Sequence, residues 1–188
     1  PVFQDDRTSA ASYFVRIGLL RLDRVRCAPD EEAAIRCDLL IGSGMLIPVR
    51  SLDEIGAMDE SLFIDHVDTD WCLRALRQRF VLLGVCGARM AHRLGDREVR
   101  ITANRRIHAH GPVRYYYLFR NSVLLYRRRY PSFRWKLADG LRLAGLFAGI
   151  AAYVSPRSQN LRAAIAGIAD GIRGRGGPAV DEQRWMPG

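Results

Sequence analysis

The chain has 188 residues, of which 48% are apolar and 26% charged, so it is long enough for one domain of ordinary size and too apolar to be wholly disordered. Basic residues outnumber acidic ones by 29 to 20, and the excess is uneven. Residues 1–92 hold 11 basic and 14 acidic groups, residues 93–136 hold 12 and 2, and residues 137–188 hold 6 and 4. The middle segment, called here the basic segment, is expected to face phosphate, lipid headgroups or nucleic acid.

The four cysteines show no pattern typical of a disulfide framework or a zinc site. Cys27, Cys37, Cys72 and Cys86 lie 10, 35 and 14 residues apart, with no C-x-x-C pair and no secretory apolar segment ahead of them. We therefore expect free thiols and a reducing, cytosolic setting.

The first half of the chain predicts an α/β arrangement. Residues 34–47 are apolar and interrupted by two glycines, which indicates a buried strand that turns tightly. A capping-box pattern predicts a short helix over residues 51–57, and spacing of three and four residues predicts a second over residues 68–79. Strands are predicted at residues 80–85 and 88–92. Strand, helix and strand in this order favour parallel pairing.

The second half predicts helices. A helix is expected to open at Pro112 with an aromatic stripe and with arginines, among them Arg120, off that stripe. Residues 137–154 have helical periodicity, and their longest apolar run of 12 residues is shorter than the ~18–20 needed to cross a bilayer, although the helix could lie in a membrane surface. A last helix is predicted from Pro156, capped by Ser155, to about Gly174.

Carboxylates concentrate just before and inside the second predicted helix. Asp65, Asp68 and Asp70 lie there with Asp59 and Glu60, and His92 ends a later strand. Such a cluster is able to hold a divalent cation or supply a general base. The same residues also suit local roles, because Asp68 is a good helix N-cap and Asp70 pairs with Arg74 at helical spacing.

Three ordered motifs resemble family-2 glycosyltransferases, and within them the bacterial rhamnosyltransferase-like group, over roughly residues 1–130. They read Gly42-Ser-Gly-Met45, Gly56-Ala-Met-Asp-Glu60 and Val67-Asp-Thr-Asp-Trp-Cys-Leu-Arg74. The resemblance implies a partial GT-A (Rossmann-like) α/β domain over residues 1–110. A basic and aromatic helical extension over residues 111–174 and a flexible tail over residues 175–188 are expected to follow.

The resemblance also implies roles for single residues. Asp68 matches the catalytic base, while Val67 stands where many members have Glu. His92 matches a histidine that helps bind Mn²⁺ or Mg²⁺ on the donor diphosphate. Residues that match positions contacting acceptor or substrate are Gly42, Ser43, Gly44, Asp70, Arg74 and Arg120.

The family's nucleotide-binding half, which carries an Asp-x-Asp motif, precedes the matching region. The chain therefore resembles a C-terminal half, and alone it is expected to be inactive.

Taken together, the expectation is an inverting transferase that moves a sugar, best matched by rhamnose, from a donor such as dTDP-rhamnose to a cell-envelope polysaccharide or lipid-linked saccharide acceptor. It is expected in the cytoplasm, peripheral at the inner membrane surface, where arginines meet phosphate and apolar helices lie in the interface. Two alternatives remain open. One is a nucleic-acid or anionic-membrane binding module built on the basic segment, although no specific nucleic-acid motif accompanies it. The other is a membrane-peripheral scaffold without catalysis.

Overall fold

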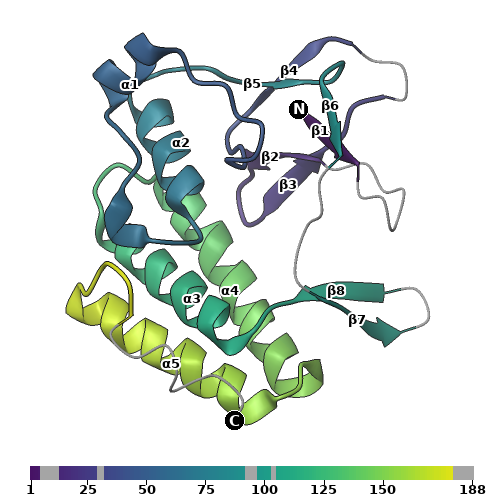
Figure 1. Cartoon of the computed structure of the whole chain (residues 1–188), viewed down its shortest axis with the longest axis vertical. Helices are drawn as coiled ribbons and strands as arrows, with labels where there is room; N and C mark the ends of the chain where they lie inside the picture. The colour runs from purple at the N-terminus through teal and green to yellow at the C-terminus, as the bar shows by residue number, and fades with distance from the viewer. Residues whose placement is uncertain (5–12, 29–31, 92–96, 103–104, 180–188) are drawn as a thin grey trace. The chain divides into compact units, whose positions relative to one another are not determined.

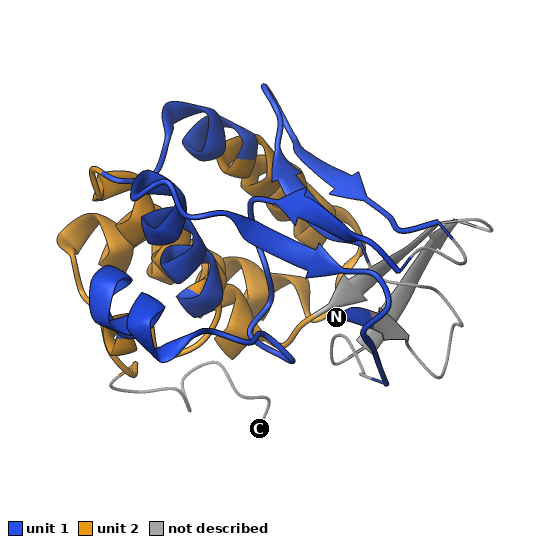
Figure 2. Ribbon diagram, turned by 90° about the horizontal axis from the view of Figure 1, so that it is seen from above, with its two compact units in different colours: residues 1–59, 67–93, 130–138 blue, residues 60–66, 94–129, 139–188 orange. Residues whose placement is uncertain are grey.

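The computed structural model describes the chain except residues 5–12, 29–31, 92–96, 103–104 and 180–188 (Figure 1). It is a mixed α/β structure, and it divides into two compact units (Figure 2). The sheet unit contains residues 1–59, 67–93 and 130–138. The helical unit contains residues 60–66, 94–129 and 139–188.

Among the described residues of the sheet unit, short strands form three two-stranded pairs, of which one is parallel and two are antiparallel. The parallel pair is β1 (Val2–Gln4) with β6 (Arg89–Ala91), and the antiparallel pairs are β2 (Phe14–Ile17) with β3 (Leu22–Val25) and β4 (Ala34–Cys37) with β5 (Leu82–Val85).

The predicted parallel pairing around the second helix is wrong. β4 and β5 run antiparallel, with Ala34 opposite Val85 and Cys37 opposite Leu82. The predicted strand at residues 34–47 is also shorter, because β4 ends at Cys37 and the chain then turns at its glycines. Periodicity identifies an apolar strand, but the direction of pairing depends on contacts made across more than forty residues.

Helix α2 (Val67–Arg77) supplies one side of the core of the sheet unit, as the spacing predicted. Its Trp71, Cys72 and Ala75 are buried against the strands, and the Trp71 indole N–H donates to the Gly56 carbonyl at 3.0 Å. Helix α1 (Val49–Ile55) precedes it. The predicted capping box is wrong in detail, because α1 starts after Pro48 and Ser51 is a buried residue within the helix.

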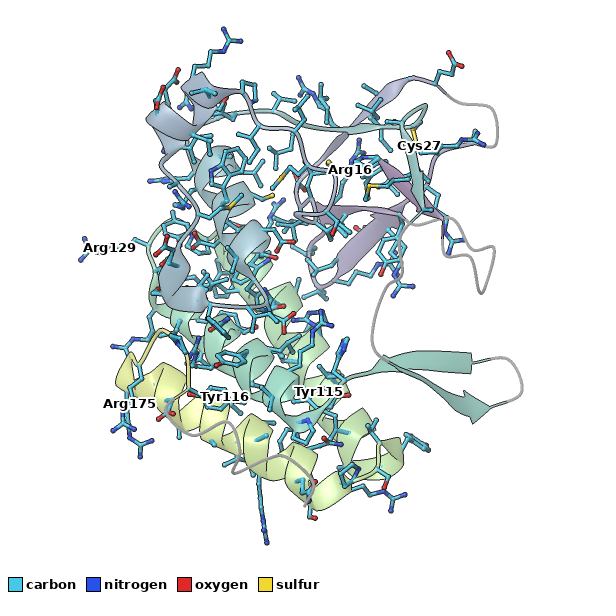
Figure 3. All side chains as sticks on the ribbon, in the orientation of Figure 1. Arg16, Cys27, Tyr115, Tyr116, Arg129 and Arg175 are labelled. Atoms are coloured by element: carbon cyan, nitrogen blue, oxygen red, sulfur yellow. A yellow bond between two sulfur atoms is a disulfide. The ribbon has the colours of Figure 1, made fainter. Side chains whose placement is uncertain are left out.

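A disulfide joins Cys27 to Cys86, which corrects the expectation of free thiols for this pair (Figure 3). Cys27 lies just after β3 and Cys86 just after β5, and folding brings their Cα atoms to 5.7 Å, within the range that a disulfide bridges. A separation of 59 residues leaves no local signal for this pairing. Cys37 and Cys72 are free and buried, as expected for cysteines that pack as small apolar side chains.

The helical unit is built on three long helices, the second of which begins in the sheet unit. They are α3 (Pro112–Arg127), α4 (Phe133–Tyr153) and α5 (Arg157–Arg173), preceded by the 3₁₀ turn η1 (Glu60–Leu62) and the antiparallel hairpin of β7 (Arg97–Thr102) and β8 (Arg105–Ala109). α5 lies alongside α3 (Figure 1). A Cβ added at Gly167 of α5 would lie 2.2 Å from the Tyr116 carbonyl oxygen, so the two backbones approach as closely as glycine allows.

The predicted helices of this unit are confirmed, with changes at their ends. Gly174 takes the left-handed conformation after α5 and ends it as predicted, at a φ of 74°. α4 begins four residues before the predicted start, at Phe133. Ser155 does not cap α5, because Pro156 holds the N-cap position. In the described part of the chain, no helix combines the length and the apolar character that a membrane span requires.

Candidate active site

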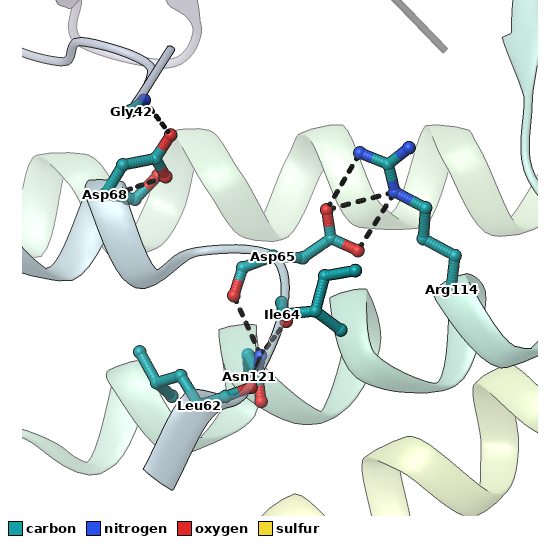
Figure 4. Close-up of polar contacts among 8 residues, drawn as sticks. Gly42, Leu62, Ile64, Asp65, Asp68, Arg114 and Asn121 are labelled. Atoms are coloured by element: carbon teal, nitrogen blue, oxygen red, sulfur yellow. Dashed lines mark hydrogen bonds and ion pairs between the residues drawn. The ribbon is translucent and has the colours of Figure 1, made fainter. Parts of the chain in front are cut away.

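Asp68 lies in the first turn of α2, where the partial positive charge of the helix start favours a carboxylate. One carboxylate oxygen accepts the Gly42 N–H at 2.9 Å, and the other accepts the N–H of Thr69 at 2.7 Å (Figure 4). The side chain is only half-buried, so water and ligands still reach it. A carboxylate held by two backbone donors and open on one side has the geometry of a fixed proton acceptor.

The glycine turn that contacts Asp68 is held by the parallel strand pair of the sheet unit. Gly44 has a φ of +67°, and a Cβ at this position would lie 2.6 Å from Pro1 Cγ and 3.3 Å from Met90 Cε. Met45 N–H closes the turn on the Gly42 carbonyl at 3.1 Å. Ser43, at the tip of the turn, is half-buried. Three of the predicted site residues, Gly42, Gly44 and Asp68, therefore meet in one place.

Asp70 and Arg74 also meet, but they do so in the interior. Asp70 is fully buried, accepts the Arg74 Nε–H at 2.9 Å and also accepts the Tyr130 hydroxyl. The Arg74 guanidinium donates to the carbonyls of Ile55 and Ala57, at 2.7 Å each. This pair joins α2 to the end of α1. The sequence offered two roles for Asp70, pairing with Arg74 and contact with the acceptor, and the contacts of Asp70 match the first.

The free thiols of the sheet unit are not nucleophiles. Burial, with a smaller contribution from Asp68, raises the pKa of Cys72 to about 12, and burial, with Asp38, raises that of Cys37 to about 11. Both are neutral near pH 7, and the thiolate rather than the thiol is the reactive form.

Arg120 does not point outward, which corrects its expected place off the buried stripe of α3. Its side chain is 1% exposed, and its guanidinium donates to the Leu62 carbonyl at 3.0 Å and the Gly177 carbonyl at 2.5 Å. The guanidinium also lies over the Tyr117 ring, 4.7 Å from its centroid. Its contacts are structural ones within the helical unit.

Other arginines of the basic segment are also engaged internally. Arg114 pairs with Asp65 at 3.2 Å, and Arg127 donates to the last carbonyls of α5. Arg129, in contrast, is exposed (Figure 3). Some of the arginines that suggested an anionic partner therefore form hydrogen bonds and ion pairs within the protein.

Three polar residues that the sequence did not single out, His66, Asn121 and Ser122, form contacts just before α2 and along α3, together with Asp65 of the carboxylate cluster. Asp65 and His66 precede α2, and Asn121 and Ser122 lie on α3, where the Ser122 hydroxyl meets His66 Nε2 at 2.9 Å. The available signal was two small polar residues in the middle of an aromatic helix, where Asn and Ser have poor helix propensity. That pattern indicates that Asn121 and Ser122 are buried, but it does not predict which residues they contact.

The expected metal site has no support among the described residues. His92 lies outside them, and the described part of the chain contains no group of three His, Cys, Asp or Glu side chains placed to bind a metal ion. Both oxygens of Asp68 accept backbone N–H groups. The metal expectation therefore stays a prediction, and the chemistry proposed for Asp68 involves no metal ion.

Comparison with known proteins finds a relative in the dTDP-rhamnosyl transferase RfbF of Shigella flexneri, 32% identical over 143 residues. This stretch is 76% of the chain and 48% of the relative, so the chain spans about half the length of the curated relative it matches. Because 143 of 188 residues must include residues 46–143, the stretch contains α2 and α3. No family model matches the chain, and no solved structure matches it.

Proposed function

We propose that this chain is the acceptor-side part of a glycosyltransferase of GT-A type and family 2, in which Asp68 is the general base. The observation that carries the proposal is the similarity to a dTDP-rhamnosyl transferase over a stretch that contains α2. The anchored, half-buried carboxylate of Asp68 supports it. The hydroxyl of a sugar acceptor becomes a good nucleophile when a carboxylate takes its proton.

The proposed reaction inverts the configuration at the anomeric carbon of the transferred sugar. Asp68 accepts the proton of the acceptor hydroxyl while that oxygen forms a bond to the anomeric carbon. The bond from that carbon to the diphosphate oxygen breaks on the opposite face, and the nucleoside diphosphate leaves with the electron pair. The Gly42 and Thr69 N–H groups keep the carboxylate in one orientation, which is the contribution of this chain to the alignment of the reactants.

The proposed donor is dTDP-rhamnose, by analogy with the name of the relative. The proposed acceptor is a lipid-linked or cell-envelope saccharide, which the resemblance to the rhamnosyltransferase-like group implies. Gly42, Ser43 and Gly44 are proposed to line the acceptor side next to Asp68. A role for Asp70, Arg74 or Arg120 in binding acceptor is not carried forward, since their polar groups are directed at interior partners. The dependence on Mn²⁺ or Mg²⁺, with His92 as a ligand, stays a prediction.

The helical unit is proposed to rest on the inner face of the cell membrane. α4 and α5 expose large apolar side chains at Leu141, Tyr153, Ile165 and Ile172. Between residues 140 and 179 the only carboxylate is Asp170, which pairs with Arg173 and Arg175. Ile165 and Ile172 lie seven residues apart and share one face of α5, and exposed apolar side chains on a helix with one carboxylate suit an anionic lipid interface. No observation favours nucleic acid over lipid as the partner of the basic segment.

The test is transfer by the full-length protein and its Asp68→Asn variant. The donor is dTDP-rhamnose, the acceptor source is the membrane fraction of the producing cells, and the readout is release of dTDP. We expect Asp68→Asn to reduce turnover by about 10²- to 10⁴-fold, the range for loss of a general base. Asp53→Asn, on the exposed face of α1, is the matched control and should keep normal turnover.

Near-normal turnover by Asp68→Asn would exclude this residue as the base. Transfer from another nucleotide sugar and none from dTDP-rhamnose would contradict the donor alone. The isolated chain, assayed beside the full-length protein, is expected to release no dTDP.

A further inference from the structure

The segment that leads into α2 has an unusual backbone. Phe63, Asp65 and His66 have φ values of 62°, 61° and 63°, in the left-handed region that side-chain-bearing residues rarely occupy. For a bulky residue such as Phe63 this conformation is an outlier. It persists only where the surroundings impose it, and such strain concentrates at functional sites. The last of the three residues directly precedes Val67, the first residue of α2.

Asn121 of α3 contacts this segment at three backbone carbonyls. Its side chain is fully buried, and its Nδ2 lies 2.9 Å from the Leu62 carbonyl oxygen, 2.7 Å from that of Ile64 and 2.9 Å from that of Asp65 (Figure 4). An amide nitrogen has two hydrogens, so three carbonyls converge on one donor group. Burying the carbonyls of such an irregular segment without a donor is unfavourable.

Neighbouring residues of α3 hold the same segment at its two ends. Arg120 donates to the Leu62 carbonyl at 3.0 Å, and the Asn121 Oδ1 in turn accepts the Arg120 Nε–H at 2.9 Å. Ser122 contacts His66 at 2.9 Å, and Arg114, two turns earlier on α3, pairs with Asp65 at 3.2 Å. The spacing of seven and eight residues from Arg114 puts it on the same face of α3 as Asn121 and Ser122.

We propose that Asn121 is a positioning residue for the transfer reaction: it holds residues 62–66 in their left-handed path and so fixes the backbone that leads into the first turn of α2, which carries Asp68. This inference rests on the proposed function for its catalytic consequence. Asn121 touches no reacting atom, and it acts through the backbone that runs from Asp65 into Asp68. The Asp65–Arg114 pair and the His66–Ser122 contact support the same path.

The test compares Asn121→Ala with Asn160→Ala in the full-length protein. Asn160 is a matched control, because it is also fully buried in the helical unit and donates one hydrogen bond, to the Val154 carbonyl at 3.1 Å. Asn121→Asp, which keeps the volume and removes the amide hydrogens, is measured in parallel in case the smaller side chain prevents folding. The readouts are hydrogen exchange of the amides of residues 62–68 and the kinetics of dTDP release from dTDP-rhamnose.

We expect Asn121→Ala and Asn121→Asp to speed exchange of these amides by about tenfold or more, while exchange in α5 changes little. We expect kcat to fall by about 10- to 100-fold, the cost of a small displacement of a catalytic group, with KM for the donor changed by less than about threefold. Asn160→Ala is expected to change neither readout.

Three results would overturn the inference. The first is unchanged hydrogen exchange at residues 62–68 in both Asn121 variants. The second is faster exchange in these variants while their kcat stays normal, and the third is a loss of kcat in Asn160→Ala as large as that in Asn121→Ala. Exchange of the Phe63 and Ile64 amides at the rate of an unstructured peptide in the unaltered protein would also overturn it. Failure of the proposed function is seen separately, as normal turnover by Asp68→Asn.

Discussion

The sheet unit and the helical unit bury different kinds of side chain. Among the described residues, seven polar or charged side chains are buried, and five of them belong to the helical unit. They are Arg120, Asn121, Ser122, Asp139 and Asn160. The sheet unit instead has an apolar core around α2, β4 and β5, and a disulfide joins the ends of two of its strands.

This difference follows from the backbone that each unit has to hold. Paired strands share backbone hydrogen bonds, and an apolar core and a covalent link add to them in the sheet unit. The helical unit contains residues 60–66, where backbone N–H groups reach the carbonyls of residues 60–62 and the Asn121 side chain donates to the carbonyls of Leu62, Ile64 and Asp65. Buried polar groups that are fully hydrogen-bonded specify one arrangement more strictly than apolar packing does.

Removing the disulfide is expected to have the largest effect on stability and to act on the sheet unit. The double variant Cys27→Ser, Cys86→Ser should lower the free energy of unfolding by about 4 kcal/mol, from the loop entropy of a 59-residue separation. Urea denaturation measures it, and hydrogen exchange should locate the loss in β4 and β5. The unaltered protein under reducing conditions is the control and should match the variant. Equal stability of the double variant and of the unaltered protein with its disulfide intact would contradict the prediction.

Filling the contact between α3 and α5 is expected to break the helical unit. In Gly167→Ala the new methyl group would meet the Tyr116 carbonyl oxygen at 2.2 Å, which costs about 3 kcal/mol because backbone cannot move aside cheaply. Gly145→Ala on α4 is the matched control. No atom lies within 4 Å of the added methyl there, and we expect a gain of about 0.5–1 kcal/mol. Thermal unfolding of both variants measures the difference, and a neutral Gly167→Ala would show that the helices are less closely packed than described.

The smallest expected effect is the pH dependence of stability that comes from Asp139, a buried carboxylate of the helical unit. It adds to the contrast between the two units. Burial by itself raises the pKa of Asp139, but Arg142, His66 and hydrogen bonds from Tyr126 and Arg142 outweigh it, so the pKa is lowered from 3.8. A carboxyl group with a lowered pKa stabilises the fold above its unfolded value and loses that contribution as the pH falls through its folded value. Asp139→Asn should therefore cost about 2 kcal/mol at pH 7, and this deficit should shrink below about pH 4.

The measurement is urea denaturation of Asp139→Asn at several pH values. Asp53→Asn, whose side chain is exposed on α1, should show no pH-dependent difference from the unaltered protein. A constant deficit for Asp139→Asn from pH 3 to pH 7 would mean that the charge of Asp139 makes no difference to stability.

The sequence by itself predicted the helices well. Apolar residues at spacings of three and four mark α2, α3 and α5, and Gly174 marks the end of α5, because these signals depend on neighbours within one or two turns. It also brought Asp68 forward as the candidate base, through an ordered set of motifs. The place of Asp68 at the start of α2 follows from the same local pattern.

The tertiary structure decided the features that depend on distant residues. The antiparallel direction of β4 and β5 and the Cys27–Cys86 disulfide both join segments without a local signal for their partner. The same holds for Arg120 and Asn121. By spacing they are polar residues on a helix, and only packing against residues 60–66 turns them into buried donors. Local periodicity reports which face of an element is apolar, whereas the partner of that face is chosen by the free energy of the whole fold.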